Sequence, residues 1–266
     1  MRRSLCTAVL FTIVLLTVGT SLAAQPPAKF PPDSLVNTRV IPHATPVLQL
    51  IGQMRNFTFD LGVRCQYCHI GEEGKPLGTF DFASDQKREK VVARQMMLMV
   101  QEINRRLDSI PGHTSGLQVT CNTCHHGASR AVPLSTVMVE AATAAGSDSA
   151  VRVYRELRTR AYGRDTYDFG EGSLNTAAFR LGRASKFEEA FAMLRLNEEM
   201  FPHSSGMYVF RGNISLMRAD TTAAEAAFRE AVRLDPTNAE AKGRLTAIGK
   251  QPSGASASAR RLRGWR

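Results

Sequence analysis

The pattern Cys-x-x-Cys-His occurs twice in this chain, as Cys65-Gln-Tyr-Cys68-His69 and as Cys121-Asn-Thr-Cys124-His125. The 266 residues include 5 cysteines, so the two motifs contain every cysteine except Cys6. Because the chain has only 6 histidines, a histidine would follow both pairs by chance about once in 2000 such chains. The repeat therefore indicates a shared chemistry around which the N-terminal half has to fold.

Three uses of paired cysteines leave part of this pattern unexplained. A zinc site made from two such pairs usually has 15 to 20 residues between them, whereas about 52 residues separate Cys68 from Cys121. A thioredoxin-like dithiol would explain one motif and not two. It also needs a surrounding pattern of alternating strands and helices, which this sequence does not show. Structural disulfides give no role to either histidine.

Covalent attachment of haem explains every residue of the motif. Two cysteines three positions apart on one helical turn reach the two vinyl groups of a haem and form thioethers, and the next histidine ligates the iron. The sequence therefore predicts two covalently bound haem c groups with their iron. The predicted attachment and proximal-ligand residues are Cys65, Cys68, His69, Cys121, Cys124 and His125.

A helix carrying Met54 is predicted before the first motif. The predicted helix has about four turns, with Thr45 as its N-cap, Pro46 at its first position and Gly62 at its C-terminal end. Apolar residues recur along it at helical spacing: Val47, Leu50, Ile51, Met54, Phe57 and Leu61. Folded back over the haem, this helix would place the Met54 sulfur against the distal face of the iron, with His43 in the loop before it.

A second helix is predicted before the second motif, capped by Ser84 or Asp85 and broken by Pro111-Gly112. Methionines on the apolar face of a helix more often fill a core than bind a metal. The predicted apolar face contains Val92, Met96, Met99, Ile103 and Leu107, and it excludes Met97.

The distal ligand opposite His125 is predicted to come from this second helix. With a haem iron nearby, Met99 is favoured over Met96, and either methionine over His113 or His126. A second strong ligand closes the iron and favours electron transfer, whereas an open iron favours ligand binding or peroxide chemistry.

These stretches resemble the multihaem cytochrome c subunit of photosynthetic reaction centres. In that family each unit consists of a helix with the axial Met, a turn, and a Cys-x-x-Cys-His motif that begins another helix. The stretch MRNFTFDLGVRCQYCHIGEEG, followed by FDFASDQK and VTCNTCHHG, is similar to that unit used twice over roughly residues 35–135. The spacings from Met54 to Cys65 and from Met99 to Cys121 resemble a short and a long variant, which supports both methionines as ligands.

The chain departs from that family in two ways. The photosynthetic subunit carries four haems, whereas this chain has two motifs, and it continues into a region that the subunit lacks. The resemblance therefore does not imply donation of electrons to a photo-oxidised chlorophyll, and a respiratory or other non-photosynthetic role fits equally.

The C-terminal region, predicted at 173–250, resembles the tetratricopeptide repeat. Residues of similar kind lie 34 positions apart: Ala190 and Ala224, Leu194 and Phe228, Pro202 and Pro236. Two repeats and a closing helix at 238–250 are fewer than the three usually needed for stability, so they should pack on the haem domain or on the helices before them. The region would serve either as a docking groove for another protein or as a helical buttress.

The N-terminus has the anatomy of an export signal. Arg2 and Arg3 precede an apolar run at 5–22, which predicts a signal peptide at 1–23 that takes Cys6 with it when cleaved; an uncleaved membrane anchor is the alternative. Export predicts a periplasmic protein, free or associated with the membrane. The remaining predicted segments are a linker at 24–34, a dihaem cytochrome c domain at 35–133, connecting helices and a loop at 134–172, and a flexible basic tail at 251–266. Within the connecting segment, one or two helices are predicted at 134–162, and the stretch GRDTYDFGEGSLN at 163–175 is predicted as a loop.

The formal net charge of +10 falls largely on the signal and the tail. No basic stripe with interleaved aromatic residues is present, so the sequence does not predict nucleic-acid binding. The predicted fold class is mainly α, with a haem-packed helical cytochrome domain rich in irregular loops and a helical repeat domain. The predicted function is electron transfer between redox protein partners, membrane-bound ones included; a dihaem peroxidase and a redox-sensing scaffold are the alternatives.

Overall fold

The computed structural model describes residues 29–112 and 116–249. Within these ranges the secondary structure is helical, with no β-strand beyond an isolated bridge between Ile70 and Asp81, so the predicted mainly α fold is confirmed. The predicted signal peptide, His113 and the basic tail lie outside the described residues. No helix in the described part of the chain is long and apolar enough to cross a bilayer.

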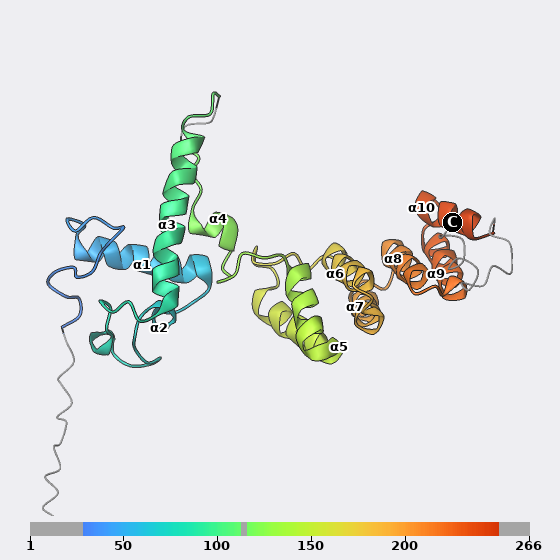
Figure 1. The fold of residues 1–266 in the computed structure, drawn as a ribbon, viewed down its shortest axis with the longest axis horizontal. Helices are drawn as coiled ribbons and strands as arrows, with labels where there is room; N and C mark the ends of the chain where they lie inside the picture. The colour runs from blue at the N-terminus through green and yellow to red at the C-terminus, as the bar shows by residue number, and fades with distance from the viewer. Residues whose placement is uncertain (1–28, 113–115, 250–266) are drawn as a thin grey trace, which may run out of the picture.

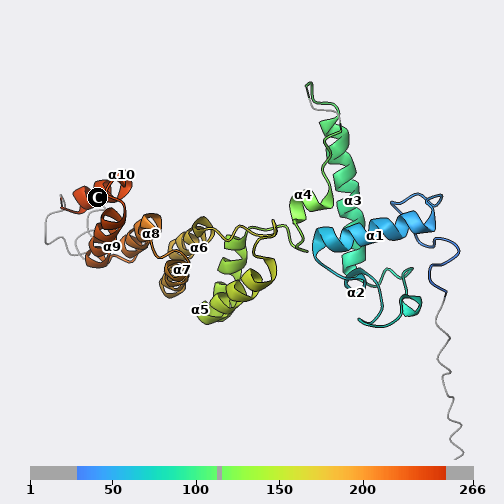
Figure 2. The same ribbon diagram turned by 180° about the vertical axis from the view of Figure 1, so that it is seen from behind.

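The helices form two groups that follow one another along the molecule (Figure 1 and Figure 2). The first group comprises α1 (Val47–Leu61), α2 (Cys65–Cys68), α3 (Arg88–Leu107) and α4 (Cys121–His125). The second group comprises α5 (Leu134–Ala161), α6 (Glu171–Arg183), α7 (Phe187–Met200), α8 (Ser205–Met217), α9 (Thr221–Leu234) and α10 (Ala239–Gly249).

In the first group the two motif helices exchange partners. Helix α1, which precedes the first motif, packs against α4 of the second motif, and α3, which precedes the second motif, packs against α2 of the first. A single 3-10 turn at Leu77–Thr79 lies in the loop between α2 and α3. The two motif units are therefore interlocked, and neither is a separate subdomain.

The predicted C-terminal end of α1 at Gly62 is confirmed, whereas the predicted N-cap at Thr45 is wrong. Gly62 adopts the left-handed conformation with φ 62°, and its N–H donates to the Phe59 carbonyl, as expected for a glycine C-cap. The helix begins at Val47, with Pro46 at the N-cap position and no side-chain cap. Thr45 lies one residue before the cap, where its N–H closes a turn onto the Pro42 carbonyl at 3.0 Å.

The predicted cap of α3 is also wrong, since the helix begins at Arg88 with Lys87 at the N-cap. The Ser84 hydroxyl instead accepts a hydrogen bond from the Gln86 N–H at 3.2 Å. The Asp85 carboxylate is engaged by cations from inside the helix, Lys90 at 3.2 Å and Arg94 at 2.9 Å. Ion pairing has therefore replaced capping as the role of this acid.

The region from 134 to 162 is predicted as one or two helices, and α5 is two helical segments joined at a sharp kink. Ala145 and Gly146 have non-helical backbone angles, and Gly146 has φ 79°, a conformation that glycine adopts without a steric penalty. The loop predicted at 163–175 is shorter than expected, because α6 begins at Glu171. The Asp168 side chain accepts from the Gly170 N–H at 2.7 Å and fixes that start.

Helices α6 to α10 repeat with a period of 34 residues. The first helices begin at Glu171, Ser205 and Ala239, and the second helices begin at Phe187 and Thr221. A left-handed residue ends α6 and α8 at equivalent places, Ser185 and Ala219. The period read from the side chains is thus also the period of the helices.

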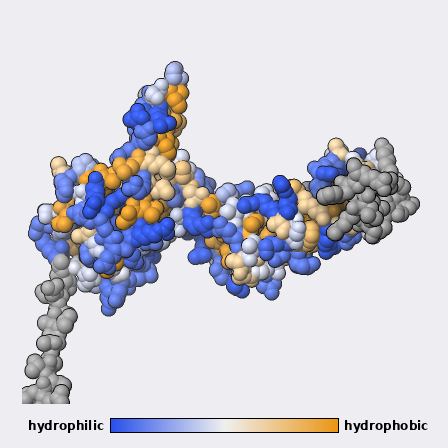
Figure 3. All heavy atoms as spheres, viewed as in Figure 1, coloured by the Kyte–Doolittle hydropathy of each residue, from blue (hydrophilic) through white to orange (hydrophobic). Residues whose placement is uncertain are grey.

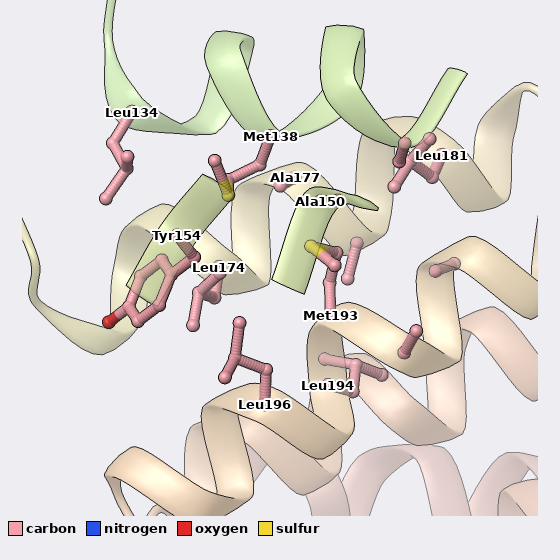
Figure 4. Close-up of a cluster of buried hydrophobic side chains, with 14 of the residues drawn as sticks. Leu134, Met138, Ala150, Tyr154, Leu174, Ala177, Leu181, Met193, Leu194 and Leu196 are labelled. Atoms are coloured by element: carbon pink, nitrogen blue, oxygen red, sulfur yellow. The ribbon is translucent and has the colours of Figure 1, made fainter. Parts of the chain in front are cut away.

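Within the described residues, the buried core lies in the second group of helices and in the loop between α5 and α6. One cluster joins α5 to α6, α7 and α8 (Figure 4), and a smaller cluster joins α8, α9 and α10. Met138, Tyr154, Leu174 and Met193 are fully buried in the first cluster. The repeats therefore pack on α5, the helix before them, which supplies the additional layer that two repeats need.

Candidate haem sites

The first motif forms the single helical turn α2, with Cys65 and Cys68 at its two ends. His69 follows in an extended conformation, and its N–H donates to the Cys65 carbonyl at 3.0 Å. Both thiols are free and partly accessible. The geometry is the one that the spacing predicts, with two thiols on one turn and an imidazole directly after it.

His69 lies in an aromatic pocket made by the returning loop. Its ring meets the Phe82 ring edge to face, with centroids 4.9 Å apart, and Phe30 and Phe80 each lie 5.6 Å from Phe82. Gly71 allows the close approach of the loop, because a Cβ there would lie 2.3 Å from the Phe80 ring. An Asp81 N–H bond to the Ile70 carbonyl, at 2.9 Å, holds the two strands of the loop together.

The environment of His69 keeps its imidazole neutral. Burial lowers the pKa of His69 to about 4; the charges of Lys90 and Arg94 lower this pKa further, whereas the Phe82 carbonyl and Asp81 raise it. Nδ1 of the ring is buried and makes no hydrogen bond of good geometry. A neutral imidazole with unused binding capacity is the form that ligates iron.

The second motif forms the turn α4, which begins where the Thr120 N–H donates to the Thr123 hydroxyl at 3.0 Å. The His125 ring is oriented by a 2.8 Å hydrogen bond between Nδ1 and the Ala128 carbonyl. With the proton on Nδ1, the lone pair of Nε2 is left for a metal, which is the usual arrangement around a ligating histidine. His126 takes the left-handed C-cap position, φ 48°.

Contacts that the sequence did not predict hold both motif turns in place. The Lys87 ammonium donates to the Gln66 carbonyl of α2 at 2.9 Å. The Asn104 amide makes two hydrogen bonds with the Val119 backbone, of 2.9 and 2.8 Å, just before α4. The sequence gives little indication of this contact, because the partner of the Asn104 amide lies 15 residues further along the chain.

Helix α1 meets the loop after α4 at very close range. The Gly127 N–H donates to the Asp60 carbonyl at 2.9 Å, and a Cβ on Gly62 would lie 2.1 Å from the Gly127 carbonyl oxygen. Glycine is therefore required at position 62 both for its left-handed conformation and for this contact.

The predicted distal methionines lie on the two long helices of this half, Met54 on α1 and Met99 on α3. Met54 is partly buried, whereas Met96 and Met99 are 42% and 49% exposed. Helix α1, which carries Met54, packs against α4 of the second motif. Helix α3, which carries Met99, packs against α2 of the first motif. The identity of each distal ligand stays a prediction.

The first group of helices fits a bound haem because its apolar residues lack a core of their own. Among residues 29–112 and 116–133 no residue is buried, and large apolar side chains of α1 and α3 are exposed (Figure 3). Exposed patches of this kind mark binding surfaces. A flat apolar macrocycle attached at a motif would cover such a face.

The alternative uses of the cysteines fit less well. Burial raises the pKa of both the Cys68 and the Cys121 thiol, whereas a reactive dithiol needs a lowered pKa. Within the described ranges no three His, Cys, Asp or Glu side chains gather to form a metal site by themselves, so the two cysteine pairs do not meet in one zinc site.

Comparison with known proteins agrees with the geometry. Residues 46–161 match the family of the photosynthetic reaction centre cytochrome c subunit. The match extends to the end of α5, beyond the 35–135 covered by the sequence resemblance. It supports a c-type, haem-binding cytochrome of the electron-transfer kind in this part of the chain.

Two curated relatives match part of the chain. The chain is 37% identical over 68 residues to cytochrome c-554 of Chloroflexus aurantiacus, covering 26% of this chain. It is 38% identical over 63 residues to the photosynthetic reaction center cytochrome c subunit of Rubrivivax gelatinosus, covering 24% of this chain. The aligned stretch spans 14% of the length of either relative.

Proposed function

We propose that this chain is an exported electron carrier with two covalent haems, one at each motif. The observation that carries the proposal is the pair of one-turn helices, each with two free thiols and a following histidine, in a half of the molecule whose described residues include no buried one. The family match over residues 46–161 supports it. Bound haem would supply one-electron chemistry at its iron, and the chain would supply attachment, ligands and enclosure.

The residues of each motif have distinct roles in this proposal. The thiols of Cys65 and Cys68, and those of Cys121 and Cys124, anchor the two haems through thioethers. His69 and His125 are the proximal ligands, kept neutral by burial in the first case and oriented by the Ala128 carbonyl in the second. Met54 and Met99 would close the distal sides, and thioether ligation favours a high potential.

The second group of helices would act mainly as a support for the haem half. Its 34-residue period is that of tetratricopeptide repeats, and its stacking on α5 joins it to the matched region. A groove of about 430 Å³ lies between α7 and α8, and charged residues of both signs line it, including Arg195, Glu198 and Arg211; it is the candidate docking place for a protein partner. We place the protein in the periplasm, because c-type haems are attached outside the cytoplasm.

Haem counting tests the proposal directly. Protein exported from a host competent in cytochrome maturation should give two haems per chain by pyridine haemochrome assay, with a matching increase in mass. Replacing Cys65 and Cys68 by Ala should remove one haem, and replacing Cys121 and Cys124 should remove the other. Colourless wild-type protein with the mass of the bare polypeptide would reject the proposal.

Spectra of single variants test the distal ligands. Met99→Leu should abolish half of the charge-transfer absorption between methionine sulfur and ferric haem, and Met96→Leu, the matched control one turn away, should leave it intact. The reverse result would assign Met96 as the ligand. A high-spin ferric signal from one haem of the wild-type protein would instead favour the peroxidase alternative.

A further inference from the structure

A network of polar contacts joins three segments behind the aromatic pocket of His69. The segments are the N-terminal stretch at 37–39, the loop at 81–85 and the first two turns of α3, and Asp85 lies where they meet. Ion pairs and hydrogen bonds therefore connect parts of the chain that lie up to 57 positions apart.

The Asp85 carboxylate is the centre of this network. It accepts a hydrogen bond from the Asn37 amide at 2.8 Å and pairs with Arg94 at 2.9 Å and with Lys90 at 3.2 Å. The hydrogen bonds from Arg94 and Lys90 hold the pKa of Asp85 well below its usual range, so the carboxylate is charged at neutral pH. A further pair with Arg39, at 3.7 Å, adds little because the Arg39 side chain is 69% exposed.

Lys90 connects Asp85 to the wall of the His69 pocket. Its ammonium donates to three consecutive carbonyls, those of Phe82, Ala83 and Ser84, at 2.8, 3.0 and 2.8 Å. The ring of the first of these residues meets the His69 imidazole edge to face. Because the Lys90 side chain is only 11% exposed, it fixes the backbone of the residue that forms the wall.

Asn37 ties the N-terminal stretch to the same loop. It adopts the left-handed conformation, with φ 60°, which asparagine tolerates better than most residues. Its carbonyl accepts from Arg94 at 2.8 Å and its side-chain amide donates to the Ala83 carbonyl at 2.6 Å. The Phe30 ring, seven residues earlier, lies 5.6 Å from the Phe82 ring, so this stretch covers the loop at two points.

We infer that Asp85 is a positioning residue for the first haem, because it holds in place the loop that orients the His69 imidazole. A neutral residue at this position would leave Lys90 and Arg94, which are 11% and 13% exposed, without their counter-ion. Like charges four residues apart on a helix repel, and a nearly buried cation that loses its partner is strongly destabilised. The loop would then relax and the Phe82 ring would move away from His69.

This inference rests on the proposed function and adds residues outside the motifs to it. Groups that contact a ligating histidine set the orientation of its ring, and the orientation affects the electronic state of the metal. The second haem provides an internal reference, because His125 is oriented by its own 2.8 Å hydrogen bond with the Ala128 carbonyl. A change that acts through Asp85 should therefore reach one haem and not the other.

Electron paramagnetic resonance spectra of the ferric holoprotein test the inference. A variant with Cys65 and Cys68 replaced by Ala identifies the signal of the second haem. Asp85→Asn should shift the signal of the first haem and leave that of the second in place, and Asp85→Glu, which keeps the charge, should stay closer to the wild type. Asp108→Asn, which removes an exposed carboxylate at the C-terminal end of α3, should shift neither signal.

A second variant decides the matter if Asp85→Asn fails to take up the first haem. Asn37→Gly keeps the left-handed backbone accessible and removes the side-chain hydrogen bonds to Ala83 and Asp85, so it should also shift the signal of the first haem alone. No shift in either variant, or equal shifts of both haem signals, overturns the inference. Such a result with two haems per chain leaves the proposed function standing, whereas wild-type protein without haem removes the proposed function itself.

Discussion

The two groups of helices differ in how far they bury their apolar side chains. Helices α5 to α10 bury a continuous set of apolar side chains, including Met138, Leu174 and Met193. Helices α1 to α4 bury none within the described residues, although α3 is as amphipathic as the repeat helices and longer than any of α6 to α10. In the proposed function the apolar side chains of the first half pack on the haems, whereas those of the second half pack on one another.

Removal of the haems should have the largest effect on stability, and this effect should be confined to the first group of helices. A variant with all four motif cysteines replaced by Ala should lose stable structure between residues 29 and 133 and keep it between 134 and 249, because only the second half has a protein core. Hydrogen exchange read by mass spectrometry measures both halves in one sample. Equal protection of the two halves in the haem-free variant would show that the first half folds without haem.

The second effect is confined to the repeat half. Gly212 of α8 is buried, and a Cβ there would lie 2.5 Å from the Phe228 ring. Gly212→Val should lower the free energy of unfolding by about 1–3 kcal/mol through overpacking while the haem content and absorption spectrum stay unchanged. Gly243→Ala in α10 is the control, because its Cβ would meet open space; it should stabilise the helix by roughly 0.5–1 kcal/mol.

The third effect is confined to the haem half. Asn104→Ala removes both hydrogen bonds to the Val119 backbone and should destabilise this half by about 1–3 kcal/mol, since the Val119 groups lose their partners. It should also loosen α4 relative to Met99 and weaken the methionine charge-transfer absorption of the second haem. The exposed Asn56→Ala in α1 provides a matched change without those contacts; an Asn104→Ala spectrum as intact as that of Asn56→Ala would contradict the positioning role.

Local signals in the sequence predicted the local structure well. The motif turns and the glycine stop of α1 depend on neighbouring residues, and the 34-residue period recurs along the sequence itself; the structure reproduces all three. The exchange of partners between the motif units was not predictable, because it depends on contacts such as that of Gly62 with Gly127 across 65 positions. Asp85 shows the same limit, since its sequence context fits a helix cap equally well until Lys90 and Arg94 are placed beside it.

The smallest expected effect concerns the link between the two halves. Arg130, in the segment before α5, donates two hydrogen bonds to the Glu140 carboxylate of α5 at 2.7 and 3.0 Å. Both side chains are exposed, so solvent and salt screen the pair and Arg130→Ala should change the melting temperature only slightly.

The pH dependence of this link has a definite sign. The pKa of Glu140 is lowered by the Arg130 hydrogen bonds, so the pair contributes fully above the unfolded-state pKa of 4.5 and its contribution is lost as the pH falls through the lower folded-state value. The small difference in melting temperature between wild type and Arg130→Ala should therefore be present at neutral pH and vanish in acid. A difference that grew on acidification, or one as large as that of Gly212→Val, would mean that the two halves are coupled through more than this contact.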